Sequence, residues 1–373
     1  MAFLMRTWIR LPLLAAGLMA AVLASIAPGL AGPSIVVDVG TGKVLSQEDA
    51  FRRWYPASLT KMITAYVVFD AIRSGEISLK SPVRISANAA KEPPSKMGYK
   101  PGSVLTIDNA MKILMVKSAN DVATAVAESV GGSEQAFAAR MNAAAARLGM
   151  TGSHFVNAHG LHSPDHYSTA RDLAVVAIAL RREFPQYAGY FALEAISSGK
   201  KVMPNNNTLI GRFSGADGMK TGYTCAAGFN LAGTATRNGR TLVAIVIGEL
   251  STETRAEKAA ELLTRGFATP GFSAPRLANL RPSGGALLRQ ATDMRPAICT
   301  EEARKARFGH RDEQGRLVIR SPYISELDRP RRVIAVGLGG ATGTGGGGSA
   351  AVYANVPIPT PRPDYRPTLA QGG

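Results

Sequence analysis

A buried helix preceded by a hairpin is the feature that most restricts the fold of this chain. The stretch 56–74 begins with Pro56, which suits a first helical turn because its missing N–H would have no partner there. Apolar residues follow at helical spacing, and Gly75 is a typical stop signal. Two strand-like runs, 34–38 and 43–46, come before it and are joined by a Gly-Thr-Gly turn. A hairpin beside a long buried helix predicts a sheet with helices on its faces.

Ser58 and Lys61 lie three residues apart at the start of this helix, so their side chains share one face. A serine hydroxyl is a poor nucleophile unless a neighbouring group accepts its proton, and a desolvated lysine amine can do so. Taken alone, the pair is better explained as a capping serine and a solvated lysine than as a nucleophile and its base, because S-x-x-K is a frequent pattern.

Two later motifs change this interpretation. Ser118-Ala119-Asn120 falls on a predicted turn between two helices, and Lys220-Thr221-Gly222 falls on a predicted strand. The patterns S-x-x-K, S-D-N and K-T-G together are typical of class A β-lactamases and penicillin-binding proteins. Here all three occur in that order, with Ala119 in place of the aspartate. One triplet indicates little, whereas three in order predict an enzyme that is acylated on serine.

Further elements are predicted along the chain. Helices are expected over 106–116, from 121 onward, over 133–148, from 168 or 169 onward, and over 253–267. Strands are expected around 219–224, 229–235 and 240–248, with Asn238-Gly239 as a hairpin turn between the last two. Residues 79–106 are expected to form loops and short strands. Beyond about Thr269, only 317–323 and 333–336 are strand-like.

The N-terminus and the charge indicate an exported protein. Residues 1–31 have a positive start, an apolar run rich in small residues and a small-x-small end, which predicts a signal peptide; the alternative is a retained membrane anchor. The formal net charge is +16, spread without aromatic interleaving or a nucleic-acid motif. This composition predicts attraction to an anionic polymer or lipid surface and no nucleic-acid partner.

Cysteines and histidines give weaker signals. Cys225 and Cys299 could pair, but they lie far apart in regions of different character, and no essential bridge is expected. The segment 154–166 holds four of the five histidines. This cluster raises the hypothesis of a zinc site, but Gly160 and Pro164 break the regular spacing and no H-E-x-x-H pattern occurs. We therefore expect a loop that shapes a pocket wall or caps the next helix, and no metal or cofactor.

From about Gly32 to Phe267 the sequence resembles the serine D-alanyl-D-alanine carboxypeptidases, which are low-molecular-mass penicillin-binding proteins. Besides the three motifs, the segments 166–173, 217–224 and 227–231 carry the resemblance. It implies an α+β fold of the penicillin-binding and β-lactamase-like transpeptidase type, with a central antiparallel sheet flanked by helices.

The resemblance also implies a role for each site residue. Ser58 would be the nucleophile and Lys61 the general base, with Ser118 and Asn120 relaying a proton and holding the substrate. The substrate's terminal carboxylate and its scissile carbonyl would be bound by a second group of residues, comprising Lys220, Thr221, Gly222, Tyr223 through its oxyanion-hole amide, and Arg255. The substrate would be a peptidoglycan pentapeptide stem that loses its terminal D-alanine through an acyl-enzyme, and β-lactams would be acylating inhibitors.

Three alternative functions share part of this machinery. A class A β-lactamase needs a deacylating glutamate within E-x-x-L-N, and none occurs between Asn120 and Lys220. An endopeptidase that cuts D-alanyl cross-links would use the same machinery, so it stays open. A catalytically slow protein that binds β-lactams or wall peptides also stays open, although the intact motifs disfavour it.

The predicted organisation has four parts. A signal peptide over 1–31 precedes a catalytic domain over 32–272, a basic extension over 273–336 of uncertain structure and a Gly- and Pro-rich, disordered tail over 337–373. The tail cannot form an apolar helix face, so we expect membrane association only if the N-terminal segment is retained. The protein is expected outside the cytoplasm, in the periplasm or its equivalent.

Overall fold

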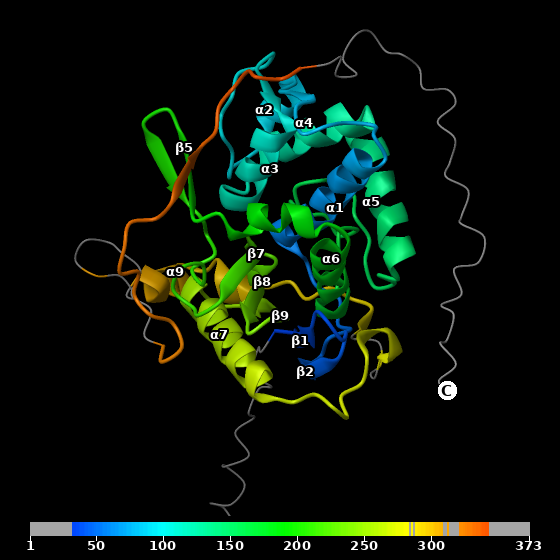
Figure 1. Ribbon diagram of the computed structural model, residues 1–373, viewed down its shortest axis with the longest axis vertical. Helices are drawn as coiled ribbons and strands as arrows, with labels where there is room; N and C mark the ends of the chain where they lie inside the picture. Colours follow the sequence, from blue (N-terminus) through cyan, green and yellow to red (C-terminus); the bar gives the residue numbers. More distant parts are fainter. Residues whose placement is uncertain (1–31, 283–284, 286–287, 309–311, 313–320, 343–373) are drawn as a thin grey trace, which may run out of the picture.

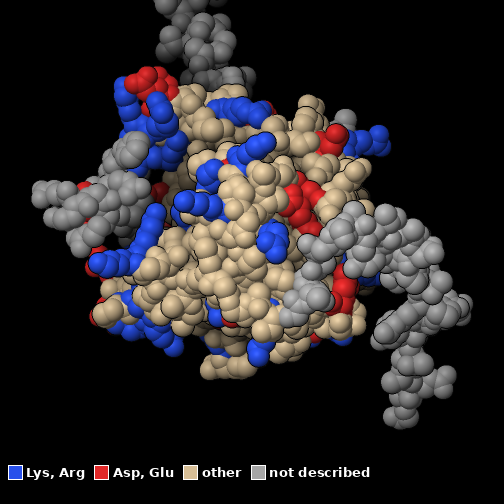
Figure 2. Space-filling view, turned by 90° about the horizontal axis from the view of Figure 1, so that it is seen from above, with Lys and Arg blue, Asp and Glu red and all other residues tan. Residues whose placement is uncertain are grey.

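The computed structural model describes residues 32–282, 285, 288–308, 312 and 321–342. The predicted signal peptide, most of the strand-like run 317–323 and most of the tail lie outside these residues. Within them, no helix combines the length and the apolar character needed to cross a membrane. Figure 2 shows Lys and Arg dispersed over one face of the molecule, among fewer Asp and Glu side chains.

A five-stranded antiparallel sheet forms the centre of the molecule, as expected for the α+β class (Figure 1). Its order is β2-β1-β9-β8-β7, so β7, which carries the K-T-G motif, is an edge strand. Both predicted hairpins are confirmed. The strands are β1 (Ser34–Asp38), β2 (Val44–Glu48), β7 (Ala216–Thr224), β8 (Gly228–Arg237) and β9 (Arg240–Glu249).

Alternation along the strands gives each face of the sheet its own core. In β9, Val243 and Ile245 belong to the larger core, which also holds α1 (Lys61–Arg73) and α6 (Ala170–Glu183). Leu242 and Ala244 belong to the smaller core under α7 (Thr252–Ala268). Successive strand residues point to opposite faces, so one buried strand serves both layers. The sheet therefore lies between helical layers, as the resemblance implies.

The helical part contains α1, α3 (Ile107–Val116), α4 (Asn120–Gly131) and α5 (Glu134–Leu148). In α1 every residue from Lys61 to Phe69 is buried, which confirms the predicted interior helix. Side chains of Thr106, Ser133, Thr169 and Ser251 accept backbone N–H groups at the starts of α3, α5, α6 and α7. Residues 79–106 form β3 (Pro82–Arg84) and β4 (Val104–Thr106), with an unpredicted short helix, α2 (Ala87–Lys91).

The C-terminal part folds back along the part that contains the central sheet. It contains η3 (Leu277–Asn279), α8 (Arg295–Ile298), α9 (Glu301–Phe308) and β10 (Val333–Ala335). Strand β10, which confirms the predicted run 333–336, pairs in parallel with β5 (Ala195–Ser198), which in turn pairs with β6 (Lys201–Pro204). The two short helices have no counterpart in the sequence expectations.

Cys225 and Cys299 form a disulfide that closes a sequence separation of 74 residues. This corrects the expectation drawn from their separation and from the different character of their surroundings. The physical reason is that α8 packs beside the turn between β7 and β8. Met294 donates its N–H to the carbonyl of Ala226 at 3.0 Å, and the Met294 and Ile298 side chains are buried in the larger core.

Candidate active site

Ser58 lies in a short 3-10 turn, η1 (Ala57–Thr60), that leads directly into α1. Strand β7 passes against this turn at Gly222. A Cβ atom added at Gly222 would lie 2.8 Å from the carbonyl oxygen of Pro56 and 3.1 Å from the amide nitrogen of Ser58. Only a residue without a side chain allows this approach. The K-T-G glycine therefore brings the backbone of Tyr223 beside the turn that carries Ser58.

Lys61 is fully buried, and its Nζ has three partners. It lies 2.9 Å from Oδ1 of Asn120, 2.7 Å from the carbonyl oxygen of His159 and 3.1 Å from Oγ of Ser58. Two of these partners can only accept. A neutral amine can donate to both of them and keep its lone pair for the hydroxyl proton of Ser58.

The surroundings of Lys61 favour that neutral form. Burial lowers the pKa of Lys61 well below its usual value, and Lys220 lowers it further, whereas Glu92 and Asp121 oppose this shift. A lysine that is deprotonated near neutral pH can act as a general base.

The S-A-N segment orients two polar groups toward the lysines. Nδ2 of Asn120 donates to the carbonyl oxygen of Pro93 at 3.0 Å, which leaves Oδ1 to face Lys61. Ser118 has a backbone φ of +60°, a left-handed conformation, immediately before α4. Its Oγ accepts a hydrogen bond of 3.0 Å from Nζ of Lys220.

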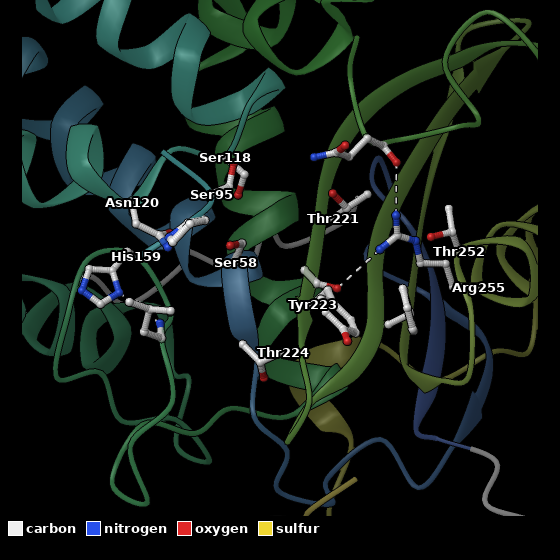
Figure 3. A pocket seen from close by; sticks show the side chains of 16 residues that line it. Ser58, Ser95, Ser118, Asn120, His159, Thr221, Tyr223, Thr224, Thr252 and Arg255 are labelled. Atoms are coloured by element: carbon white, nitrogen blue, oxygen red, sulfur yellow. Dashed lines mark hydrogen bonds between the residues drawn. The ribbon is translucent and has the colours of Figure 1, made fainter. Parts of the chain in front are cut away.

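Lys220 and Arg255 supply positive charge from β7 and α7. Burial, followed by the charge of Arg255, lowers the pKa of Lys220 to about 7. Burial lowers the pKa of Arg255 to about 10, so its guanidinium remains cationic at neutral pH. Arg255 is held by backbone carbonyls, with Nη1 3.4 Å from Gly222 O and Nη2 3.1 Å from Asn206 O (Figure 3).

A cavity of about 430 Å³ connects these groups. Figure 3 shows Ser58, Thr221 and Arg255 around it, with Tyr223 and Thr224 along β7. Every site residue expected from the sequence lies here. Lys61 and Lys220 are buried behind the surface, and the others line it: Ser58, Ser118, Asn120, Thr221, Gly222, Tyr223 and Arg255. The remaining lining residues were not anticipated individually, namely Pro94, Ser95, His159, Gly160, Leu161, Asn206, Thr224, Phe229 and Thr252.

The histidine-rich loop forms one wall of the cavity, as predicted. A Cβ atom on Gly160 would lie 1.9 Å from the carbonyl oxygen of Ala57, so the loop packs directly on the turn that carries Ser58. His166 is buried, with Nε2 2.8 Å from Oγ1 of Thr60 and Nδ1 accepting from Val156 N. Burial lowers the pKa of His166 to about 3, which keeps this imidazole neutral.

Among the described residues, one group offers three metal-ligating side chains: Glu92, Glu134 and His159. Nε2 of His159 lies 3.4 Å from Oε1 of Glu92 and 3.3 Å from Oε1 of Glu134, while Nδ1 accepts the N–H of Leu161 at 3.0 Å. This network assigns the ring proton to Nε2. A metal on Nε2 would require the proton on Nδ1, facing another N–H, so the arrangement does not fit a metal. It instead fixes the loop whose carbonyl at His159 holds Lys61.

Comparison with known proteins agrees with this geometry. A family model described as D-alanyl-D-alanine carboxypeptidase matches residues 23–251, more than half of the chain. The D-alanyl-D-alanine carboxypeptidase DacC of Escherichia coli (strain K12) is 35% identical over 240 residues, which cover 62% of this chain and 60% of that protein. The chain thus spans about 60% of the length of this curated relative.

Solved structures show the same fold. Penicillin binding protein 5 from Haemophilus influenzae has a TM-score of 0.61 at 32% identity, covering 64% of this chain and 71% of that one. Penicillin-Binding Protein D2 from Listeria monocytogenes, in its cefotaxime-bound form, has a TM-score of 0.58 at 28% identity. The match covers 64% of this chain and 97% of that one. The chain therefore belongs to the D-alanyl-D-alanine carboxypeptidase family.

Proposed function

We propose that this protein is a serine-type D-Ala-D-Ala carboxypeptidase, which removes the terminal D-alanine from peptidoglycan pentapeptide stems through an acyl-enzyme on Ser58. The observation that carries the proposal is the environment of Lys61. Its buried Nζ lies 3.1 Å from the Ser58 hydroxyl and has two acceptor-only partners besides. That arrangement is suited to accepting a proton from the serine.

The acylation step follows from these positions. Oγ of Ser58 attacks the carbonyl carbon between the two D-alanines while its proton moves to Lys61. The developing oxyanion is bound by the backbone amides of Ser58 and Tyr223, and each donor in such a hole contributes about 3 kcal/mol to the transition state. Collapse breaks the C–N bond, and the leaving amine takes a proton through Ser118, whose Oγ is hydrogen-bonded to Lys220.

The substrate's terminal carboxylate is recognised at the other end of the cavity. The hydroxyl of Thr221 donates to it, and Arg255 and Lys220 provide the positive potential. Arg255 is held by three backbone carbonyl contacts and does not need to reorganise on binding. Water then attacks the ester of the acyl-enzyme, and the machinery that activated Ser58 activates this water. The four-residue stem is released and Ser58 is regenerated.

β-Lactams would enter the same path as acylating inhibitors. Their strained amide occupies the place of the scissile bond, and ring opening on Ser58 leaves an ester that water reaches slowly. The cefotaxime-bound form of the Listeria relative supports this part of the proposal. Every step uses side chains and amides of the chain itself.

We further propose that the protein works outside the cytoplasm. The predicted signal peptide over 1–31 and the similarity to D-alanyl-D-alanine carboxypeptidases support this location. Cell fractionation with N-terminal sequencing of the recovered protein tests it, and a start near Gly32 is expected. A chain that stays in the cytoplasm with residues 1–31 intact would contradict it.

The activity is tested by D-alanine release from a pentapeptide that ends in D-Ala-D-Ala, with the native chain and Ser58→Ala. We expect release by the native protein and none by the variant. A cross-linked dimeric muropeptide is assayed in parallel. Cleavage of the dimer without D-alanine release would support the endopeptidase instead, and penicillin labelling without either reaction would support a slow binding protein.

A further inference from the structure

The segment 289–307 lies outside the residues that match the family model, yet it packs against the active-site strand. Its Cys299 is bonded to Cys225, two residues beyond Tyr223 on the chain. The Tyr223 hydroxyl lies 3.5 Å from Sγ of Cys299. Covalent and packing contacts therefore hold this segment, which we call the C-terminal wall, at the end of β7.

The C-terminal wall also lies close to segments on the other side of β7, although none of its residues lines the cavity itself. Nη1 of Arg53, just before the turn that carries Ser58, donates to the carbonyl oxygen of Arg289 at 2.9 Å. Burial and then the charge of Arg295 lower the pKa of His162, which belongs to the loop opposite β7. The wall therefore lies close both to the end of β7 and to the histidine-rich loop.

A bound peptide would run toward this wall. β7 is the edge strand of the sheet, and an extended peptide can add to such an edge at about 3.3 Å per residue. With the terminal carboxylate at Thr221 and the scissile carbonyl at Ser58, the preceding residues pass Thr224 and approach the disulfide. This direction rests on the proposed function.

The wall contributes a cation beside the cavity lining. The guanidinium carbon of Arg307 on α9 lies 5.6 Å from the ring centroid of Phe229, which lines the cavity. The Phe229 ring is 4.4 Å from the ring of Tyr223, so Arg307 is separated from β7 by one aromatic layer. Elsewhere in the wall Asp293 pairs with Arg295, and Glu301 pairs with Lys305. The remaining charged residues are Arg289, Glu302 and Arg304, so together with Arg307 the wall has a net positive charge.

We propose that the C-terminal wall forms an additional subsite for the part of the peptide that precedes the two terminal residues, and that Arg307 selects peptides with an acidic side chain there. The disulfide keeps the wall in place. Arg307 is thus a specificity-determining residue, and it takes no part in the bond-breaking step.

The test measures how peptides compete with a fluorescent penicillin for Ser58, because this readout does not require peptide turnover. Two pentapeptides ending in D-Ala-D-Ala are compared, one with a glutamate in third position and one with a glutamine. For Arg307→Ala we expect the concentration of the acidic peptide that halves the labelling rate to rise about fivefold, which is the range of an exposed charge pair. The value for the neutral peptide should change by less than about twofold.

Arg304→Ala is the matched control, since Arg304 is an exposed arginine on the same helix. It should leave both values unchanged. The second variant combines Cys225→Ser with Cys299→Ser. It should weaken binding of the acidic peptide more than binding of the neutral peptide. The inference would be overturned if Arg307→Ala weakened the binding of both peptides equally, or if it changed the binding of neither. Absence of penicillin labelling in the native protein would instead refute the proposed function.

Discussion

Replacing Asn120 by aspartate should disable Lys61 as the proposed general base while leaving the size of the side chain unchanged. Oδ1 of Asn120 lies 2.9 Å from Nζ of Lys61, and both side chains are almost completely buried. Aspartate has the same shape but carries a negative charge. That charge stabilises the protonated amine, so the pKa of Lys61 should rise from its depressed value.

The distance sets the size of the effect. Two unit charges 2.9 Å apart attract by about 6 kcal/mol at an effective dielectric constant of 20, which corresponds to about 4 pKa units. Burying the new carboxylate beside the carbonyl oxygen of Pro93 costs part of this, so we expect a rise of about 2 to 3 units. Below its pKa the fraction of neutral Lys61 falls tenfold per unit. At pH values below the native pKa of Lys61 the labelling rate should therefore fall about 100- to 1,000-fold, and the loss should shrink as the pH rises toward the raised pKa.

The assay is the second-order rate of labelling by a fluorescent penicillin between pH 5 and pH 10. In Asn120→Asp the rate should climb with pH over a range where the native rate is already level, because Lys61 now loses its proton at higher pH. Asn120→Ala is the control, since it removes the hydrogen bonds without adding charge and should not move the rise to higher pH. A rate for Asn120→Asp that is lower by one constant factor at every pH would refute Lys61 as the base.

Three more predictions concern stability and backbone contact. His166 has a pKa of about 3 in the folded protein, whereas a histidine in the unfolded chain is protonated below about pH 6.5. The free energy of unfolding should therefore fall by about 3 kcal/mol from pH 6.5 to about pH 4. At higher pH this group should not change the stability. Urea unfolding of His166→Gln should show a smaller loss. Gly222→Ala should lower penicillin labelling at least about tenfold in a folded protein, because its Cβ meets the Pro56 carbonyl. Cys225→Ser with Cys299→Ser should cost about 4 kcal/mol in urea unfolding, from loop entropy over 74 residues.

Each of these three predictions would be contradicted by a specific result. An unchanged pH dependence of stability in His166→Gln would assign the acid sensitivity to other groups. Gly189→Ala is the control for Gly222, because nothing lies within 4 Å of an added Cβ there. Similar labelling rates for the two alanine variants would show that the contact at Gly222 has no effect. A loss of less than about 1 kcal/mol in the double serine variant would contradict the loop-entropy argument.

The central residues were predictable because their geometry is local. Ser58 and Lys61 share a helix face by spacing alone, and a turn followed by a helix places Ser118 and Asn120 together. The sheet hairpins follow from short-range turn signals such as Asn238-Gly239. What these local rules cannot give is which motifs meet. That step came from the family resemblance, and the geometry of the cavity agrees with it.

The missed features depend on contacts between distant parts of the chain. Asn206 enters the site only because Arg255, 49 positions away, donates to its carbonyl. Helix α8 spans only Arg295–Ile298, which is too short for a helical pattern to be recognised. Without that helix nothing in the sequence places Cys299 beside Cys225. Backbone carbonyl contacts carry no side-chain signature, so these positions become visible only in the folded molecule.

The most direct test of the account is the location of the covalent adduct. The full chain is incubated with a penicillin, digested and analysed by mass spectrometry, with Ser58→Ala and Lys61→Ala in parallel. We predict an adduct on the peptide that contains Ser58, none in Ser58→Ala, and a greatly slowed adduct in Lys61→Ala. An adduct on another residue, or none in a folded native protein, would contradict Ser58 as the nucleophile and with it the proposed carboxypeptidase mechanism.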